Sequence, residues 1–352
     1  MPLGVDSVTI DKNKVDSDKV SAGGVMKQIA VLATNSSISS DVFGLLDFFE
    51  YCNVLWQMQQ SHQAGPLVHC YLVSPDGAPL LLKPGVTLAV QPHNWHQADA
   101  LILPAAYAYN RAQLAELAGQ SAAYFPALKQ AAANGTLIAA NCTGTFILAG
   151  SGLLAHKNAT SSWFFKEVFQ SLYPDVHLQL NKLLVQDDNL LTAGATTSFI
   201  NLCLALTERL VGEQFARQMA KVMLTDPNRS SQIPYMDLSI GQHHNDTLIT
   251  EVQKYLAKTL AEPFALEALA EQFHLTKRTL LRRFKAALDD TPLNYLQRLR
   301  VEQAKRLLET TDQPIEQIVL QVGYEDMSSF RKLFLNYTEL TPSQYRQKFM
   351  QE

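Results

Sequence analysis

The C-terminal part of the chain carries a repeated pattern of apolar and polar positions. Apolar side chains recur at intervals of three and four residues over Leu266–Phe273, and a second apolar stripe follows over Leu280–Leu288 after a polar break. This spacing puts the apolar side chains on one face of each helix, and Thr276 in the break is a residue type that caps helices. The pattern predicts two short helices joined by a tight turn, over about residues 265–288.

The same pattern recurs further along the chain. The stripe that begins at Leu266 recurs from Ile315, which is 49 residues later. Gly323 then supplies a turn before a helix that Asp326 would cap. The pattern predicts a second helix pair over about residues 314–337, with a turn one residue longer than the first. A long amphipathic run over residues 292–309 predicts a connecting helix that holds the two pairs at a fixed separation.

The outer face of each second helix is polar or basic. Two short helices joined by a tight turn, the second with a basic outer face, are typical of the helix-turn-helix unit that enters the DNA major groove. We expect this domain to contact two adjacent major-groove segments of promoter DNA. The predicted DNA-binding residues are Lys277, Arg278, Leu281, Arg282, Lys285, Ser328, Ser329, Arg331 and Lys332.

The positive charge is local. Residues 246–352 contain 15 Lys and Arg and 15 Asp and Glu, so the region is formally neutral. Residues 276–288 instead carry five cations and no acid, and attraction to phosphate would come from this stripe. Periodicity alone leaves a second interpretation open, in which the helix pairs belong to an ordinary all-α protein with a solvated basic face.

The region from about Asp246 to Phe349 resembles the AraC/XylS family of transcription regulators. The matching motifs are T-K-R-T-L-L-R-R-F, R-L-R-V-E-Q-A-K-R-L-L, V-G-Y-E-D-M-S-S-F-R-K-L-F and L-T-P-S-Q-Y-R, in that order. The resemblance implies a sequence-specific activator of transcription that contacts RNA polymerase. Two positions depart from the family. Glu339 replaces the usual Gly and leaves a helix end less relaxed, and Leu281 replaces a frequent Gln, which favours contact with a thymine methyl group.

Short β runs alternate with amphipathic helices in residues 26–225. The predicted strands cover residues 27–33, 68–73, 100–103 and 137–140, with a hairpin over 79–90, and the predicted helices cover residues 39–60 and 112–133. This alternation predicts a doubly wound, flavodoxin-like α/β sandwich with helices on both faces of the sheet.

The predicted strand over residues 137–140 runs into Asn141, Cys142 and Thr143 and then into another helix. A strand, a sharp turn with a nucleophilic side chain and a helix form the pattern of a nucleophile elbow. The helix N-terminus would favour a thiolate and any bound anion. A cysteine nucleophile also needs a base or a charged partner.

The region from about Lys27 to Leu224 resembles the class I glutamine amidotransferase-like superfamily, in its PfpI-type branch. The matching motifs are I-A-A-N-C-T-G-T-F-I-L-A-G-S-G-L-L, A-T-S-S-W and G-L-L-D-F-F-E-Y-C-N. Such a domain joined to an AraC-type reader is a combination found in regulators that resemble the GlxA group. Compared with enzymatic relatives, Ser162 and Thr143 each replace a His, whereas Asp41 matches an acidic position that some of them retain.

The loss of both His positions predicts that the domain does no catalysis. Cys142 and Asp41 would be a vestigial elbow, and Asp41, Cys142, Thr143 and Ser162 would line an effector pocket at the carboxyl edge of the sheet. Two alternatives stay open: a cysteine-dependent hydrolase or hydratase fused to a DNA-binding module, and a constitutive DNA-binding protein whose first domain only dimerises.

Composition adds bounds to this organisation. The chain has 352 residues, a net charge of −4 and four cysteines without metal-type or disulfide-type spacing. The H-N-W-H motif at residues 93–96 has no nearby Cys or carboxylate partner, so we expect no metal and no cofactor. We expect a disordered tail (1–25), a sensor and dimerisation domain (26–225), a linker (226–245) and a DNA-binding domain (246–352). The protein would be a cytoplasmic homodimer with a small-molecule effector and no membrane segment.

Overall fold

The chain forms two compact units in a computed structural model that describes residues 25–60, 65–90, 95–226, 229–237 and 244–350. The larger unit, here called the α/β unit, takes in the described residues up to Ser230 apart from Trp163–Lys166 and Leu180–Lys182. The second, here called the helical unit, takes in those two segments and Ser231–Glu352. The tail predicted over residues 1–25 lies outside the described residues, apart from Val25.

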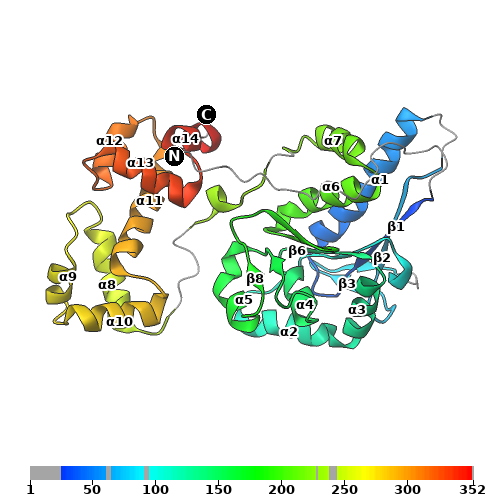
Figure 1. Cartoon of the computed structure of the whole chain (residues 1–352), viewed down its shortest axis with the longest axis horizontal. Helices are drawn as coiled ribbons and strands as arrows, with labels where there is room; N and C mark the ends of the chain where they lie inside the picture. The colour runs from blue at the N-terminus through cyan, green and yellow to red at the C-terminus, as the bar shows by residue number, and fades with distance from the viewer. Residues whose placement is uncertain (1–24, 61–64, 91–94, 227–228, 238–243, 351–352) are drawn as a thin grey trace. The chain divides into compact units, whose positions relative to one another are not determined.

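A six-stranded sheet forms the centre of the α/β unit (Figure 1), in the order β2-β1-β5-β6-β10-β9. All neighbours are parallel except β10 and β9, which pair antiparallel. The chain therefore winds outward from β1 in both directions, which confirms the doubly wound prediction. The strands are β1 (Lys27–Leu32), β2 (Val68–Val73), β5 (Ala100–Leu103), β6 (Leu137–Asn141), β9 (Leu184–Asp187) and β10 (Leu190–Ala193). Two small sheets pair β3 (Leu80–Leu82) with β4 (Val86–Leu88) and β7 (Asn158–Ala159) with β8 (His177–Leu178).

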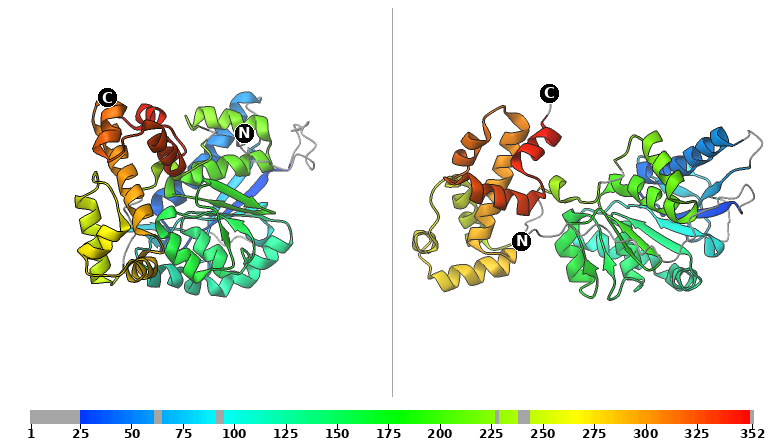
Figure 2. Two further views of the ribbon diagram at one scale, coloured as in Figure 1. Left: turned by 60° about the vertical axis from the view of Figure 1, so that its left-hand side comes forward. Right: turned by 45° about the horizontal axis from the view of Figure 1, so that its top comes forward.

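Helices cover both faces of the sheet, as the alternating pattern predicts. Figures 1 and 2 show α1, α6 and α7 on one face and α2, α3 and α4 on the other, and α1 packs against α6. The central strand β6 is buried along its whole length, because a parallel strand between two helical layers has no solvent-facing side. The helices are α1 (Ser39–Gln59), α2 (Arg111–Ser121), α3 (Phe125–Ala133), α4 (Gly144–Gly150), α5 (Lys166–Leu172), α6 (Phe199–Leu210) and α7 (Glu213–Val222).

The single helix predicted over residues 112–133 is wrong in one respect, because the chain breaks it near its middle. A 3-10 turn, Ala122–Tyr124, separates α2 from α3. Pro126 lies in the first turn of α3, where no N–H group has a hydrogen-bond partner within the helix. In the middle of a continuous helix, the missing N–H of proline would remove a hydrogen bond. The alanine-rich pattern concealed this break, since alanine favours a helix on either side.

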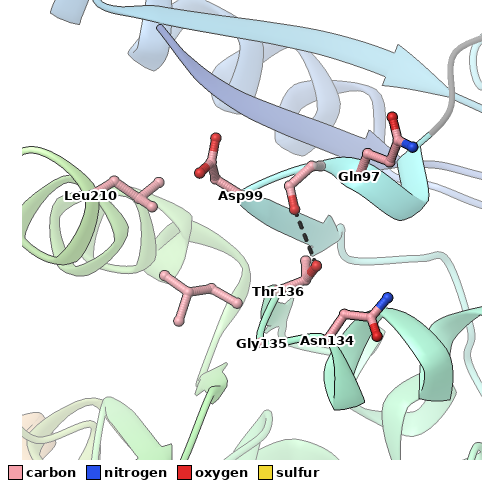
Figure 3. Close-up of a pocket in the computed structure, with 8 residues that line it drawn as sticks. Gln97, Asp99, Asn134, Gly135, Thr136 and Leu210 are labelled. Atoms are coloured by element: carbon pink, nitrogen blue, oxygen red, sulfur yellow. Dashed lines mark hydrogen bonds between the residues drawn. The ribbon is translucent and has the colours of Figure 1, made fainter. Parts of the chain in front are cut away.

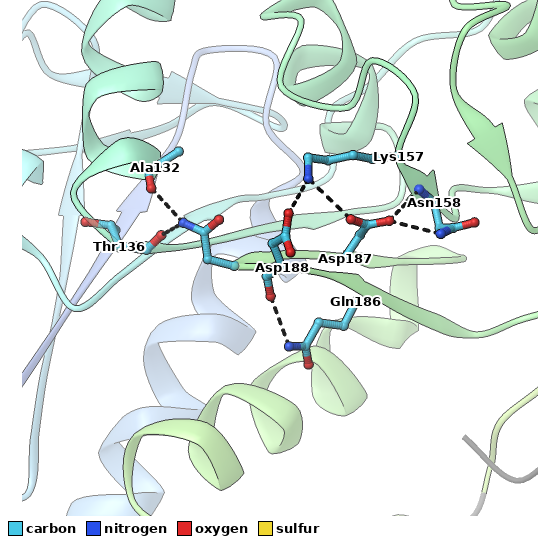
Figure 4. A network of polar contacts seen from close by, with 8 residues as sticks. Ala132, Thr136, Lys157, Asn158, Gln186, Asp187 and Asp188 are labelled. Carbon is cyan, nitrogen blue, oxygen red and sulfur yellow. Dashed lines mark hydrogen bonds and ion pairs between the residues drawn. The ribbon is translucent and has the colours of Figure 1, made fainter. Parts of the chain in front are cut away.

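A polar network closes the edge of the sheet at the β9–β10 hairpin (Figure 4). Lys157 forms ion pairs with Asp187 and Asp188, and Asn158 donates its backbone and side-chain N–H groups to Asp187. Burial raises the pKa of Asp187, but the hydrogen bonds from Asn158 and the Lys157 ammonium lower it further, so the net pKa is below its usual value. Asn189 donates to the carbonyl oxygens of Ala132 and Thr136, both at 2.8 Å. The network therefore joins the hairpin to the turn before β6.

The helical unit is built on the long helix α11. Figure 1 shows α8, α9 and α10 around one end of α11 and α12, α13 and α14 around the other. Each group encloses its own apolar core, one centred on Leu280 and Phe284 and the other on Phe330 and Phe334. The helices are α8 (Thr247–Lys258), α9 (Leu266–Gln272), α10 (Lys277–Leu288), α11 (Pro292–Thr310), α12 (Ile315–Gln321), α13 (Met327–Thr338) and α14 (Pro342–Phe349).

Candidate functional site

Helix α10 and helix α13 begin and end in the same way. The Thr276 hydroxyl accepts the N–H of Thr279, and the Asp326 carboxylate accepts the N–H groups of Ser328 and Ser329, so each helix has a side-chain N-cap. Each helix also ends at a left-handed residue, Asp289 in α10 (φ 52°) and Glu339 in α13 (φ 58°). Equivalent positions in the two helices are therefore fifty residues apart.

The turns before the two helices differ by one residue, as the sequence pattern predicts. His274 takes the left-handed conformation in the first turn (φ 53°), and Gly323 takes it in the second (φ 81°). Gly323 also lies close to another part of the chain, since a Cβ there would come within 2.7 Å of the Ala261 carbonyl oxygen. Glycine is the residue that satisfies both demands.

The nine residues predicted to contact DNA all lie on exposed positions of α10 and α13. The opposite faces of the helices are buried, with Leu280, Phe284, Phe330 and Phe334 at 0% exposure. Burial of one face fixes the rotation of each helix about its axis, and this places the predicted residues on the solvent side. Leu281 is 36% exposed even though it is apolar.

Intramolecular partners divide the eight polar residues of this set into two groups of four. Lys277 pairs with Glu267 and Lys285 with Asp289, and the hydroxyls of Ser328 and Ser329 donate to Asp326. The hydrogen bonds from Ser329 and then Ser328 hold the pKa of Asp326 well below its usual range. Within the described part of the chain, no hydrogen bond or ion pair involves the side chains of Arg278, Arg282, Arg331 and Lys332.

Arg283 lies in the same basic stripe of the sequence but is directed into the helical unit. Its Nε and Nη2 atoms donate to the two carboxylate oxygens of Asp246, at 2.9 and 2.6 Å. The same carboxylate caps α8 by accepting the N–H groups of Leu248 and Ile249. The hydrogen bond from Arg283 lowers the pKa of Asp246, and burial raises it by a smaller amount. The net pKa of Asp246 is therefore below its ordinary value. Arg283 therefore has a structural role that the cation count alone could not separate from DNA contact.

Helix α11 fixes the separation of the two helix-turn-helix units. Arg300, which is 8% exposed, donates to the carbonyl oxygens of Leu260 and Glu262 at 2.9 and 2.8 Å. Its guanidinium also lies 5.2 Å from the ring centroid of Tyr324, in the turn of the second unit. One buried side chain thus joins the end of α8 to the turn before α13, which the apolar spacing of the connector did not indicate.

In the α/β unit, β6 ends in a sharp turn at Cys142. Cys142 has a φ of 52°, and α4 begins two residues later at Gly144. A Cβ on Gly144 would come within 2.7 Å of the Pro104 carbonyl oxygen, so the start of α4 packs directly against the chain that leaves β5. This strand-turn-helix geometry is that of a nucleophile elbow, in which the left-handed residue stores backbone strain.

Asp41 lies at the centre of a buried hydrogen-bond network beside the elbow. Its carboxylate accepts the N–H of Ala105 and, at 3.0 Å, the side-chain amide of Asn141. Asn141 also donates to the Thr196 carbonyl oxygen at 2.8 Å. Burial raises the pKa of Asp41 to about 6, against the lowering effect of the Ala105 and Asn141 hydrogen bonds. Sequence reasoning missed Thr196, because no motif links it to its contact Cys142, which lies 54 residues earlier in the chain.

The Cys142 thiol is not activated. Burial raises its pKa to about 11, and the hydrogen bond with Thr196 lowers it by less than burial raises it. The nearby Asp41 carboxylate also opposes ionisation of the thiol, because both groups would be negative. The thiolate that the strand-turn-helix pattern led us to expect is therefore not favoured, because burial raises the pKa of the thiol by more than its hydrogen bonds lower it.

The four predicted pocket residues come together around this elbow but are almost fully enclosed. Asp41, Cys142, Thr143 and Ser162 are between 0% and 8% exposed. The Thr143 hydroxyl is bound to the backbone of Ala106, with its oxygen 2.7 Å from both N and O. A ligand would therefore reach these side chains only after a local opening of the structure around them.

A hollow of about 420 Å³ lies at the other end of the strands from the elbow, where β5 and β6 begin (Figure 3). The turns that precede β5 and β6 line it with Gln97, Asp99, Asn134, Gly135 and Thr136, and Leu210 lies on its other side. The Thr136 hydroxyl donates to the Ala98 carbonyl oxygen, which joins the two turns. This cavity contains none of the four predicted pocket residues.

Two of the histidines considered as metal ligands cannot be placed. His93 and the side chain of His96 lie outside the described residues. The sequence offers His69 as a third candidate metal ligand, and its Nδ1 atom lies 3.0 Å from the Gln28 side-chain oxygen. No helix among the described residues combines the length and apolar character needed to cross a membrane.

Known proteins match both units. Residues 269–348 match a family model for a helix-turn-helix domain, and residues 29–209 match the model of the DJ-1/PfpI family. The HTH-type transcriptional regulator CdhR of Pseudomonas aeruginosa is 28% identical over 286 residues, which cover 80% of this chain and 82% of that protein. The regulator ArgR of the same organism is 28% identical over 224 residues, covering 62% of this chain and 67% of that protein. Among solved structures, Drosophila melanogaster DJ-1beta has a TM-score of 0.47 at 18% identity and covers 57% of this chain and 100% of that one.

Two helix-turn-helix units of this kind, combined with a doubly wound α/β unit, define a DNA-binding transcription regulator of the AraC type. The chain belongs to the DJ-1/PfpI family, whose model matches more than half of its length.

Proposed function

We propose that the protein is a metabolite-responsive activator that reads two successive major-groove segments with α10 and α13, about one helical turn (~34 Å) apart. The observation that carries this proposal is a set of exposed cations on the two helices that form no hydrogen bond or ion pair with any residue that the structure describes. Arg278 and Arg282 lie on α10, and Arg331 and Lys332 lie on α13. An unpaired exposed cation can bind phosphate or a base edge without first losing a protein contact.

The partnered residues of the same face have a second role. Lys277 and Lys285 are held by exposed carboxylates, and Ser328 and Ser329 are bound to the helix cap. Exposed ion pairs are weak, about 0–1 kcal/mol, so DNA phosphate would displace Glu267 and Asp289 at little cost. We therefore assign Lys277 and Lys285 to the phosphate backbone, which positions the helix without reading sequence.

Substitution of Arg282 tests the proposed interface. Arg282→Ala should weaken specific DNA binding by about 1–3 kcal/mol. It should leave the helix folded, because no described residue forms a hydrogen bond or ion pair with this side chain. Fluorescence anisotropy with an operator duplex measures the change. The matched control is Arg217→Ala, an exposed arginine of α7 in the α/β unit whose side chain is 70% exposed, and its affinity should equal that of the wild type. Unchanged affinity and base preference in Arg282→Ala would show that this face does not contact DNA.

In our proposal the α/β unit binds a small-molecule effector at the elbow and mediates homodimerisation, without catalysis. The support for a non-catalytic role is that Asp41 and burial both oppose a Cys142 thiolate, which a cysteine enzyme needs. The elbow offers a carboxylate, an amide and hydroxyls to a ligand that opens its covering loops. Contact with RNA polymerase would follow from the activator role.

Thermal shift of the full chain tests the effector site. Amino acids, betaines, polyamines and small acids are screened against the wild type and Asp41→Asn, and a ligand that binds the folded state must raise its melting temperature. We expect a hit whose shift is reduced in Asp41→Asn. A ligand that shifts both proteins equally would place the site elsewhere, and no shift with any ligand would favour a domain that only dimerises. Turnover that is lost in Cys142→Ser would favour the hydrolase alternative.

A further inference from the structure

The two recognition helices differ in chemistry at one equivalent position of their exposed faces. Five residues after the cap, α10 carries Leu281 and α13 carries Arg331. The caps and the left-handed ends match, so these two residues project from the same place on their helices. At the next residue both helices carry a cation, Arg282 in α10 and Lys332 in α13.

Leu281 is not one of the side chains that form the apolar core around Leu280 and Phe284. It is 36% exposed, whereas its neighbours Leu280 and Phe284 are fully buried. In the major groove the apolar feature of a base pair is the 5-methyl group of thymine. Contact with this methyl group would cover the exposed surface of Leu281.

Arg331 presents the opposite chemistry. Among the described residues its guanidinium has no hydrogen bond or ion pair, so its fork of N–H donors is free. The matching acceptors in the major groove are O6 and N7 of guanine, which arginine binds in a bidentate manner.

We propose that the two DNA segments bound by one monomer differ in sequence: Leu281 specifies a thymine in the segment read by α10, and Arg331 specifies a guanine at the equivalent place in the segment read by α13. This inference rests on the proposed groove-facing role of α10 and α13. A later pair of equivalent positions shows the same difference in the reverse order, with a cation, Lys285, in α10 and an apolar residue, Leu335, in α13. We assign no base there, because residues near the helix N-terminus contact the bases and Lys285 is paired with Asp289.

The test begins with the operator. Duplexes that bind the full chain are selected from a random library, and each position is then replaced in turn. Deoxyuridine in place of thymidine removes only the methyl group, and 7-deazaguanine removes only the N7 acceptor. One thymine-to-uracil replacement should weaken wild-type binding about fourfold, as expected for one buried carbon group. One 7-deazaguanine replacement should weaken it roughly tenfold or more.

Variants assign each effect to its side chain. The uracil effect should vanish in Leu281→Ala and the 7-deazaguanine effect in Arg331→Ala. Leu281→Gln should change the selected thymine to adenine, because a glutamine amide pairs with adenine, and leave the second segment unchanged. Gln347→Ala is the control, since Gln347 is exposed on α14, outside the two recognition helices, and its selected sequence should equal that of the wild type.

Failures of the inference and of the interface are distinguishable. Two identical selected segments, or insensitivity to both base analogues, would overturn the assignment of thymine and guanine. Weaker binding by Leu281→Ala and Arg331→Ala that is equal for all sequences would also overturn it, while leaving α10 and α13 in the groove. Unchanged affinity and selected sequence in both variants would remove the groove-facing role itself.

Discussion

Among the described residues of the helical unit, three that are not glycine hold a left-handed backbone conformation: His274, Asp289 and Glu339. A side chain with a Cβ pays about 1–2 kcal/mol for this conformation, and glycine does not. The conformation persists because each residue ends a helix whose other contacts require the chain to turn there. At Glu339 the side chain is exposed and has no hydrogen bond or ion pair among the described residues.

Replacing Glu339 by glycine should therefore stabilise the helical unit. Glu339→Gly is expected to raise the free energy of unfolding by about 1 kcal/mol, because it removes the strain at a φ of 58° and no contact. Urea unfolding measures the change. Gly323→Ala is the opposite change and should lower stability by roughly 2–4 kcal/mol. A Cβ at Gly323 would strain the left-handed backbone and would lie 2.7 Å from the Ala261 carbonyl oxygen. A loss of stability in Glu339→Gly would contradict the strain argument.

Asp41 should make the stability of the α/β unit depend on pH. Its pKa rises from 3.8 to about 6 on folding, mainly through burial, so the folded state holds the proton more strongly than the unfolded state. The stabilisation is complete below about pH 4 and is lost as pH rises through 6. The total loss is about 3 kcal/mol as an order of magnitude.

Asp41→Asn isolates this effect, because an amide does not titrate and still fits the space. The difference in unfolding free energy between the wild type and Asp41→Asn should fall as pH rises from 4 to 7. Urea titrations at intervals of pH measure it. Parallel pH profiles of the two proteins would mean that Asp41 titrates equally in the folded and unfolded states.

At the scale of elements, α11 joins the two helix-turn-helix units. Its first half packs on the core that contains Leu280, and its second half packs on the core that contains Phe330. Arg300 adds polar contacts across the junction through Leu260, Glu262 and Tyr324. If α10 and α13 bind DNA as we propose, both can do so at once only while this junction keeps them at a fixed separation.

Arg300→Met should weaken DNA binding without touching the DNA-binding face. The change leaves the Leu260 and Glu262 carbonyls without donors, which should lower stability by roughly 1–3 kcal/mol. Affinity for an operator with both segments should fall, whereas affinity for a duplex with the α10 segment alone should stay near the wild-type value. Anisotropy titrations on the two duplexes check this, and an equal loss on both would point to general unfolding instead.

At the scale of the whole molecule, part of the predicted linker belongs to the helical unit. The 3-10 turn Ile233–Tyr235 contacts α13, and the Tyr235 ring packs 5.1 Å from that of Phe349. The ammonium group of Lys305, which is 7% exposed, donates to the Met236 carbonyl oxygen and pairs with Glu302 at 2.9 Å. The chain that leaves the α/β unit is thus bound to the DNA-reading unit before α8 begins.

Removing the Lys305 charge should be costly, and a second change should recover part of the loss. Lys305→Met removes the ammonium group that donates to the Met236 carbonyl oxygen and pairs with Glu302, which should lower stability by roughly 1–3 kcal/mol. The double variant Lys305→Met, Glu302→Met should be more stable than the single one, because it also removes the half-buried carboxylate that has lost the Lys305 ammonium. Urea unfolding of the four proteins of this cycle measures the coupling, and strictly additive effects would contradict it.

Short-range patterns of the sequence determined much of this protein. Apolar spacing over Leu266–Phe273 and its recurrence from Ile315 predicted both helix-turn-helix units, the longer second turn and the exposed residues, because one buried face fixes the rotation of a helix. Alternation of strands and helices predicted the doubly wound sheet for the same local reason. The caps at Thr276 and Asp326 were also readable, since a cap acts within three residues.

Tertiary structure alone decided which polar groups are free and which are occupied. Arg282 and Arg283 are adjacent in the sequence, yet Arg283 is bound to Asp246, 37 residues away, whereas Arg282 is exposed and has no hydrogen bond or ion pair among the residues placed in the structure. The state of Cys142 was likewise undecided, because desolvation depends on every segment that covers the elbow and not on the motif that forms it. The burial of a side chain and its pairing with a distant residue depend on contacts between segments far apart in the sequence. A local sequence pattern therefore cannot predict them.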